Sequence, residues 1–113
     1  PHQVRDLIFT ASADTATLAE VTLLSGTASA FNDLIEVTCA NTSNAAVTVG
    51  IRETTGGSVT KLFAIAANSS VSRDFSVPVP QAIAATTWTI KNEGTGDIST
   101  TVISCSALFV RNV

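Results

Sequence analysis

Apolar residues recur at every second position along most of this chain, and this periodicity constrains the fold more than any other feature of the sequence. Apolar and polar residues alternate in "LIEVTCAN" (34–41), in "AAVTVGIRE" (45–53) and in "VSRDFSV" (71–77). A period of two places successive side chains on opposite faces of a strand, and no stretch longer than ten residues keeps a helical period. The sequence therefore predicts an all-β chain.

Turn-forming residues separate the apolar runs and indicate where strands begin and end. The adjacent glycines of "TTGG" (54–57) can take positive φ and predict a hairpin. The two prolines in 78–85 cannot donate to a ladder, so this segment is expected at a sheet edge or as a crossing. A polar break is expected at "SADTA" and a loop over 25–33. Strands are expected over residues 4–10, 16–24, 34–41, 45–53, 58–66, 71–77, 86–92 and 98–112.

Short strands at intervals of about ten residues are typical of a sandwich or barrel. A length of 113 residues supplies one domain with one core. We therefore predict a single β-sandwich domain, residues 1–113, of about seven to nine antiparallel strands with a jelly-roll or Greek-key-like topology. An immunoglobulin domain is not predicted, because Trp88 lies near the second cysteine rather than after the first.

The two cysteines lie in alternating runs and point toward apolar neighbours. Cys39 shares its face with Ile35 and Val37, and Cys105 shares its face with Phe109. Two interpretations follow: buried thiols that act as small hydrophobes, or a disulfide between the two sheets. No metal site is predicted, because two isolated cysteines and a single terminal histidine cannot supply four ligands at the usual spacing.

The composition limits the classes of partner. Only 13% of the residues are charged, about half of the usual share, while 17 Thr and 12 Ser supply hydroxyl groups. Such a surface costs less to cover with a partner, because few charges must be desolvated. The net charge of −3 argues against nucleic acid and an anionic membrane, and the short apolar runs predict no membrane span. Pro1 suggests removal of an initiator Met, and thus synthesis in a cytoplasm.

No catalytic residues and no cofactor are predicted. The only histidine, His2, is next to the terminus, Tyr is absent, and the carboxylates are scattered through expected turns and solvent-facing positions. "EGTGD" (93–97) lacks the spacing of a phosphate-binding loop and is expected to be a turn. The N-glycosylation triplets at Asn41 and Asn68 are interpreted as turn residues. Trp88 is expected inside the core, although an exposed Trp88 would favour glycan binding.

From residue 34 to the C-terminus the chain resembles a loose group of small tailed-bacteriophage virion proteins. The resemblance rests on a strand that ends in an N-T-S turn ("VTCANTSNAAVTVGI"), a glycine-turned hairpin, an "AANSS" turn before a strand, and a terminal strand. Residues 1–33 have no counterpart in this pattern. The resemblance implies a capsid decoration (cement) protein or, alternatively, a tail-associated or receptor- or glycan-binding module.

A decoration protein implies a place on the virion, at the capsid surface, and synthesis in the bacterial host cytoplasm. The expected partners are the major capsid protein or other virion subunits. The chain is also expected to form a homo-oligomer, most simply a trimer. The N-terminal residues 1–15 are expected either as an extended arm or as the first strand of the chain's own sandwich. In the arm, Arg5 and Asp6 would fix the register while Leu7 and Phe9 bury apolar area on a neighbour, with His2 as a further contact.

Overall fold

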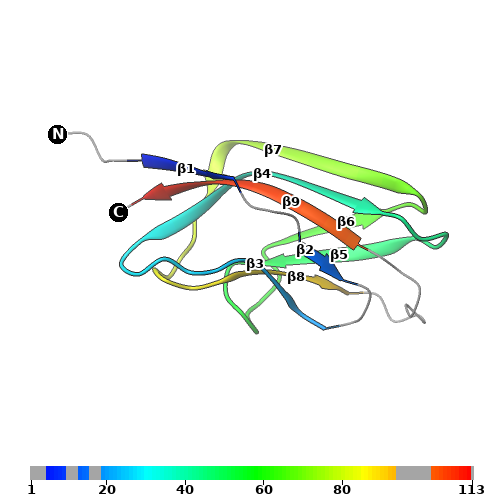
Figure 1. Cartoon of the computed structure of the whole chain (residues 1–113), viewed down its shortest axis with the longest axis horizontal. Helices are drawn as coiled ribbons and strands as arrows, with labels where there is room; N and C mark the ends of the chain where they lie inside the picture. Colours follow the sequence, from blue (N-terminus) through cyan, green and yellow to red (C-terminus); the bar gives the residue numbers. More distant parts are fainter. Residues whose placement is uncertain (1–4, 10–12, 16–18, 94–102, 113) are drawn as a thin grey trace.

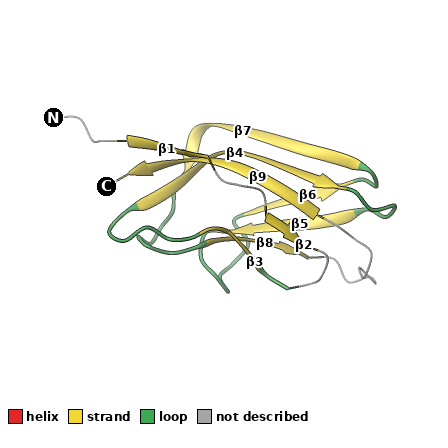
Figure 2. Ribbon diagram, viewed as in Figure 1, coloured by secondary structure: helices red, strands yellow, loops and turns green. Residues whose placement is uncertain are grey.

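The computed structural model describes residues 5–9, 13–15, 19–93 and 103–112, and within these ranges the chain forms strands and no helix. The all-β prediction is confirmed (Figure 2). The strands are β1 (Arg5–Phe9), β2 (Ala13–Thr15), β3 (Val21–Leu24), β4 (Phe31–Asn41), β5 (Val47–Arg52), β6 (Lys61–Ile65), β7 (Ser69–Val79), β8 (Trp88–Asn92) and β9 (Ile103–Asn112). No helix in the described ranges is long and apolar enough to cross a membrane.

The strands form two antiparallel sheets that pack as two layers (Figure 1). Sheet A has the order β1-β9-β4-β7, with β2 also paired to β9, and sheet B has the order β3-β8-β5-β6. The strand pairs are nested in the sequence. β5 and β6 form the innermost hairpin, β4 pairs with β7 around it, and β3 pairs with β8 around those four strands; β1 and β2 pair with β9 on the outside. A long hairpin rolled up in this way is a jelly roll, which decides between the two predicted topologies.

The N-terminal segment forms part of the chain's own sheet. In β1, Arg5 lies opposite Asn112 and Phe9 lies opposite Leu108. β2 pairs with the same strand farther along, so the polar break predicted at "SADTA" is wrong for its central residues. An edge strand needs only one partner for its backbone, which makes such a position tolerant of polar residues. His2 lies outside the described residues.

The expected strands agree with the structure in their centres and differ at several ends. β3 begins at Val21, later than the predicted strand over 16–24, whose residues 16–18 lie outside the described ranges. β4 begins at Phe31, inside the segment predicted as a loop, because this end pairs with β9. Pro78 lies in β7, which is an edge strand as the prolines predicted. The turn predicted at 93–97 lies almost entirely outside the described residues.

A β-bulge in β4 changes which residues face the core. Leu34 pairs with Phe109 and Glu36 pairs with Leu108, so Ile35 is the extra residue. Leu34 is fully buried while Ile35 is only partly buried. Strict alternation had placed Ile35 on the core face, and this prediction is wrong because the bulge shifts the alternation by one residue.

The core lies between the sheets and is organised around Trp88. Its ring is fully buried and contacts the ring of Phe109, with the two ring centroids 5.3 Å apart. The indole N–H donates to the backbone carbonyl of Asn32 at 2.7 Å, so the only polar atom of the side chain is satisfied. The interior position predicted for Trp88 is therefore confirmed. Other buried members of the core are Leu23, Leu34, Val37, Val47, Val49, Ile51, Phe63, Ile65, Ile90 and Ile103.

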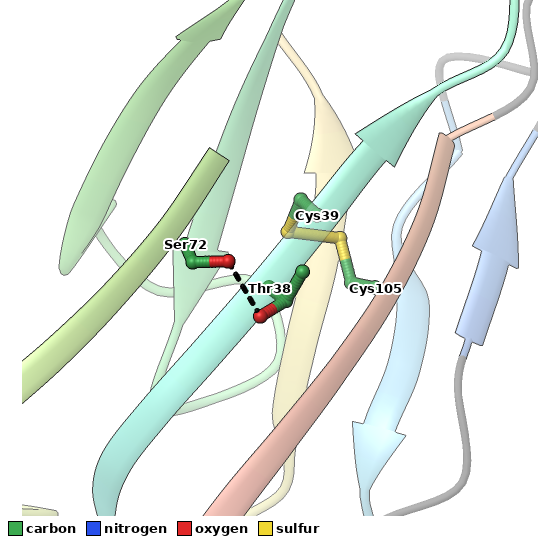
Figure 3. The surroundings of a disulfide bond; sticks show 4 residues. All are labelled: Thr38, Cys39, Ser72 and Cys105. Atoms are coloured by element: carbon green, nitrogen blue, oxygen red, sulfur yellow. Dashed lines mark hydrogen bonds between the residues drawn. A yellow bond between two sulfur atoms is a disulfide. The ribbon is translucent and has the colours of Figure 1, made fainter. Parts of the chain in front are cut away.

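A disulfide joins Cys39 to Cys105 within sheet A (Figure 3). The two residues are direct partners on the neighbouring strands β4 and β9, with their Cα atoms 4.1 Å apart. The interpretation of Cys39 and Cys105 as two buried thiols is therefore wrong. The alternative with a disulfide had placed the bond between the two sheets, and that placement is wrong because β4 and β9 are adjacent strands of sheet A. Both residues are buried, so the bond is part of the core.

Replacement of Cys39 by Ala should lower the free energy of unfolding by about 4 kcal/mol, because the bond closes a long loop in the unfolded chain. Cys39→Ala, Cys105→Ala and the double variant should destabilise the chain by similar amounts, since each one breaks the same bond. Denaturant unfolding of the four proteins measures this. A double variant that costs the sum of the two single changes would indicate two independent thiols instead.

Candidate interaction surface

The outer face of sheet A carries short, neutral side chains. Thr38 pairs with Ser72 on one side and with Ser106 on the other, and the three residues cross the sheet in one row. The hydroxyls of Thr38 and Ser72 are hydrogen-bonded at 2.9 Å (Figure 3). The neighbouring row consists of Ser70, Ala40 and Ser104. We call these six residues the hydroxyl face.

The alternation of side chains along β4 explains why the hydroxyl face points away from the core. Val37 and Cys39 point inward from β4 and are buried, so Thr38 between them must point outward. The high Thr and Ser content predicted a neutral, hydroxyl-rich surface, and the hydroxyl face of sheet A is a part of it. Such a face carries few charges that must be dehydrated, which suits contact with another protein surface.

A pair of carboxylates borders the hydroxyl face. Glu36 and Asp74 are direct partners on β4 and β7, and both are exposed. Like charges that lie directly opposite each other on a sheet are destabilising. The outward-facing residues of β4, β7 and β9 include no Lys or Arg to offset them. This end of the face is therefore negative.

Two cations close the adjacent side of the sandwich, where the edge strands β6 and β7 meet. The Lys61 ammonium of β6 lies 5.4 Å from the ring centroid of Phe75 in β7. In the opposite direction, the Arg73 guanidinium of β7 lies 5.7 Å from the ring centroid of Phe63 in β6. These contacts cover the core between two strands that belong to different sheets, and they make this side of the molecule positive.

Glu20, which lies just before β3, connects the turn of the β5–β6 hairpin to β8. Its carboxylate accepts the N–H of Gly56 at 3.0 and 3.1 Å and the hydroxyl proton of Thr89. Gly56 has φ of 74°, so one of the two glycines takes the predicted positive φ. The Thr89 hydrogen bond is the largest cause that lowers the pKa of Glu20; burial opposes it, while Gly56 and the cations Arg52 and Lys91 add to it.

A second charged contact lies on the same outer face of sheet B. Arg52 pairs with Glu93 at 2.5 Å, and both side chains are largely buried. Gly50 makes room for this pair, because a Cβ atom there would lie 2.4 Å from a Glu93 carboxylate oxygen. These charges are therefore used within the chain and are not available to a partner.

Gln81 connects the loops at one end of the sandwich and is almost fully buried. Its side-chain oxygen accepts the N–H of Asn32 at 2.9 Å, and its amide donates to the carbonyls of Glu53 and Thr86 at 3.1 and 2.8 Å. Its own N–H donates to Asp33 at 2.9 Å. These bonds have a structural role and leave no reactive group exposed.

The asparagines of the two glycosylation triplets differ in accessibility. Asn41 is buried, and its amide donates to the carbonyls of Ala45, Ile65 and Ala66. Asn68 is exposed in a turn with φ of 51°. Asn68 is a turn residue, as predicted, but the turn predicted at Asn41 is wrong because Asn41 is the last residue of β4.

Two hollows open on the described surface, and neither gathers groups for chemistry. One, of about 330 Å³, lies between Asn41 and Asn68 and is lined by small polar residues. The other, of about 470 Å³, is lined by Glu53, Val59 and Ile83 among others. Within the described ranges no three His, Cys, Asp or Glu side chains are placed to hold a metal ion.

The predicted contact residues Arg5, Asp6, Leu7 and Phe9 lie together in β1, at the outer edge of β9 and on the same sheet as the hydroxyl face. Their predicted contact with a neighbour stays a prediction. Sequence reasoning missed the Glu36–Asp74 pair and the Lys61 and Arg73 contacts. These depend on strand register and on which strands lie at the edges, and the sequence carries no local signal for either.

The fold is similar to solved structures of viral coat proteins. The coat protein of Tobacco streak virus, in a structure of its dimer, matches with a TM-score of 0.56 and 9% identity over 96% of this chain and 84% of that chain. Its C2 crystal form matches with a TM-score of 0.55, again at 9% identity, over 96% and 85% of the two chains. At such low identity the similarity establishes the fold alone.

A structure of Bacillus endospore appendages, which form disulfide-linked pili, has a TM-score of 0.49 and 15% identity over 100% of this chain and 91% of that chain. No protein-family model matches the sequence, and no curated protein matches it.

Replacement of Glu20 by Gln should destabilise the chain by about 1 kcal/mol at neutral pH, as expected for loss of charge-assisted hydrogen bonds. Because the folded pKa of Glu20 is lowered, its contribution is complete above the pKa of the unfolded chain and disappears as the pH falls through the folded value. The difference in Tm between wild type and Glu20→Gln should therefore shrink in acid. A difference that stays constant from pH 7 to pH 2 would contradict this account.

Proposed function

We propose that this chain is a structural subunit of a virion and, more specifically, a capsid decoration protein that binds the outer capsid lattice. The observation that carries the proposal is the hydroxyl face, a neutral area on one layer of a jelly roll. The similarity in fold to a viral coat protein supports the virion part of the proposal. Jelly rolls are a frequent architecture of viral capsid domains.

Attachment would use the part of sheet A formed by β1 and β9. Leu7 lies opposite Val110 and Phe9 lies opposite Leu108, so the N-terminal contact residues and β9 form one continuous strip of the sheet. The partner would be the major capsid protein or another virion subunit. The chain would be made in the bacterial host cytoplasm and then occupy the capsid surface.

Stabilisation of a capsid by a bound decoration protein is a linkage effect and requires no catalytic chemistry. A subunit that binds the assembled lattice more tightly than loose capsid subunits stabilises the lattice in proportion to that difference in affinity. A face with few charges loses little solvation energy in such a contact. We therefore propose a role in assembly and stability rather than an enzymatic role.

The alternative function, a tail-associated or glycan-binding module, has less support. Glycan-binding sandwiches commonly present a flat aromatic ring to the sugar, but Trp88 is fully buried. Phe31 is the most exposed aromatic among the described side chains whose exposure is defined, with 37% of its surface accessible. The buried position of Trp88 therefore favours the decoration function.

The proposal predicts regular occupancy on capsids. Purified chain added to undecorated phage particles should occupy repeated lattice positions in electron cryomicroscopy. Ser106→Arg should reduce occupancy at least tenfold, because it places a long charged side chain in the hydroxyl face. Leu62→Arg is the matched control: Leu62 is 59% exposed on the outer face of sheet B, and this change should leave occupancy unaltered.

Particles that stay undecorated by the wild-type chain would contradict the proposed function. Equal loss of occupancy in both variants would contradict the assignment of the contact to sheet A. Circular dichroism and thermal melting of each variant show that a lost contact does not result from unfolding.

A further inference from the structure

Two patches of opposite charge lie on adjacent sides of the sandwich, and neither is neutralised by a salt bridge found among the described residues. The negative patch is Glu36 and Asp74 on the outer face of sheet A. The positive patch is Lys61 and Arg73 on the side formed by β6 and β7. Arg73 and Asp74 are neighbours in β7, so alternation along one edge strand places the two signs on different sides of the molecule.

We propose that the negative patch of one copy of this chain binds the positive patch of the next copy. The Glu36–Asp74 pair is a repulsive arrangement in the isolated chain, and cations from a second copy would remove that repulsion. The positive groups are held in place for this contact, because each one lies against an aromatic ring. The guanidinium of Arg73 can bind a carboxylate with two parallel hydrogen bonds.

The part of sheet A formed by β4 and β7 can supply this contact and leaves the strip formed by β1 and β9 for another partner. Two strands of 11 residues at about 3.3 Å per residue and about 4.8 Å spacing cover about 350 Å². A specific interface buries about 800 Å² per partner, so this area supplies nearly half of one side and suits a weak contact. Thr38, Ala40, Ser70 and Ser72 provide neutral contact area beside the carboxylates, while the charges set the orientation and exclude wrong arrangements.

The position of the patches restricts the symmetry of the assembly. A two-fold dimer made by the outer face of sheet A alone would bring the same carboxylates toward one another. Contact between the two different patches can be reciprocal across a two-fold axis, or it can be heterologous, in which case the copies form a closed ring when the rotation closes. This inference concerns contact between copies and holds whether or not the chain binds a capsid.

Light scattering on the chain alone, without particles, tests the contact. The wild type should have a multiple of the 11.6 kDa mass of one chain, and this mass should fall at high salt. The double variant Glu36→Lys with Asp74→Lys and the double variant Lys61→Glu with Arg73→Glu should each have the mass of one chain. The variant with all four reversals should regain the wild-type mass, because both patches then have exchanged sign.

The matched control is Leu62→Lys, which adds a charge on the outer face of sheet B and should leave the mass unchanged. The milder pair Glu36→Gln with Asp74→Asn serves if the reversals unfold the chain; it should keep a cooperative melting transition and still lose assembly. A wild-type monomer at millimolar concentration would overturn the proposal. An assembly that survives either double reversal, or one that the four reversals do not restore, would also overturn it.

Discussion

The pairing of β4 with β9 is the interaction on which the rest of the structure depends. These two strands form the centre of sheet A, and every other strand of that sheet is added to one of them. Their ladder runs from Phe31 to Asn41 and includes the disulfide between Cys39 and Cys105. Because the ladder brings together residues from distant parts of the chain, it can form only after the segments between them have been brought back into place. The jelly roll is the topology that results: β5, β6, β7 and β8 lie in the loop that this ladder closes, while β1, β2 and β3 precede the ladder and pair with β9 or β8.

The same ladder separates the two kinds of side chain that give the molecule its surface. The inward-facing residues in the middle of β4, Leu34, Val37 and Cys39, are apolar, and outward-facing residues near its C-terminal end are Thr or Ala. The bulge at Ile35 moves the alternation by one residue, so that Glu36 faces outward beside Asp74. The neutral face and its negative border therefore arise from one strand, and their separation depends on the position of a single extra residue.

The sequence predicted the fold class and the interior position of Trp88 because both follow from local alternation and composition. It also predicted an edge position for the segment with Pro78, since proline lacks a ladder donor. It could not predict the bulge, because Leu34 and Ile35 are adjacent apolar residues and the sequence does not show which of them faces the core. The contacts of Glu20 join residues far apart in the chain, so they depend on strand order, which local patterns do not specify.

The disulfide has a consequence for damage by proteases. All the loops between β4 and β9 lie between Cys39 and Cys105, and several of them are at the surface. A cut in any of these loops produces two fragments that remain one covalent molecule, held by the bond inside the core. A nicked subunit would therefore keep both halves in place, and its break would be visible only on a reducing gel.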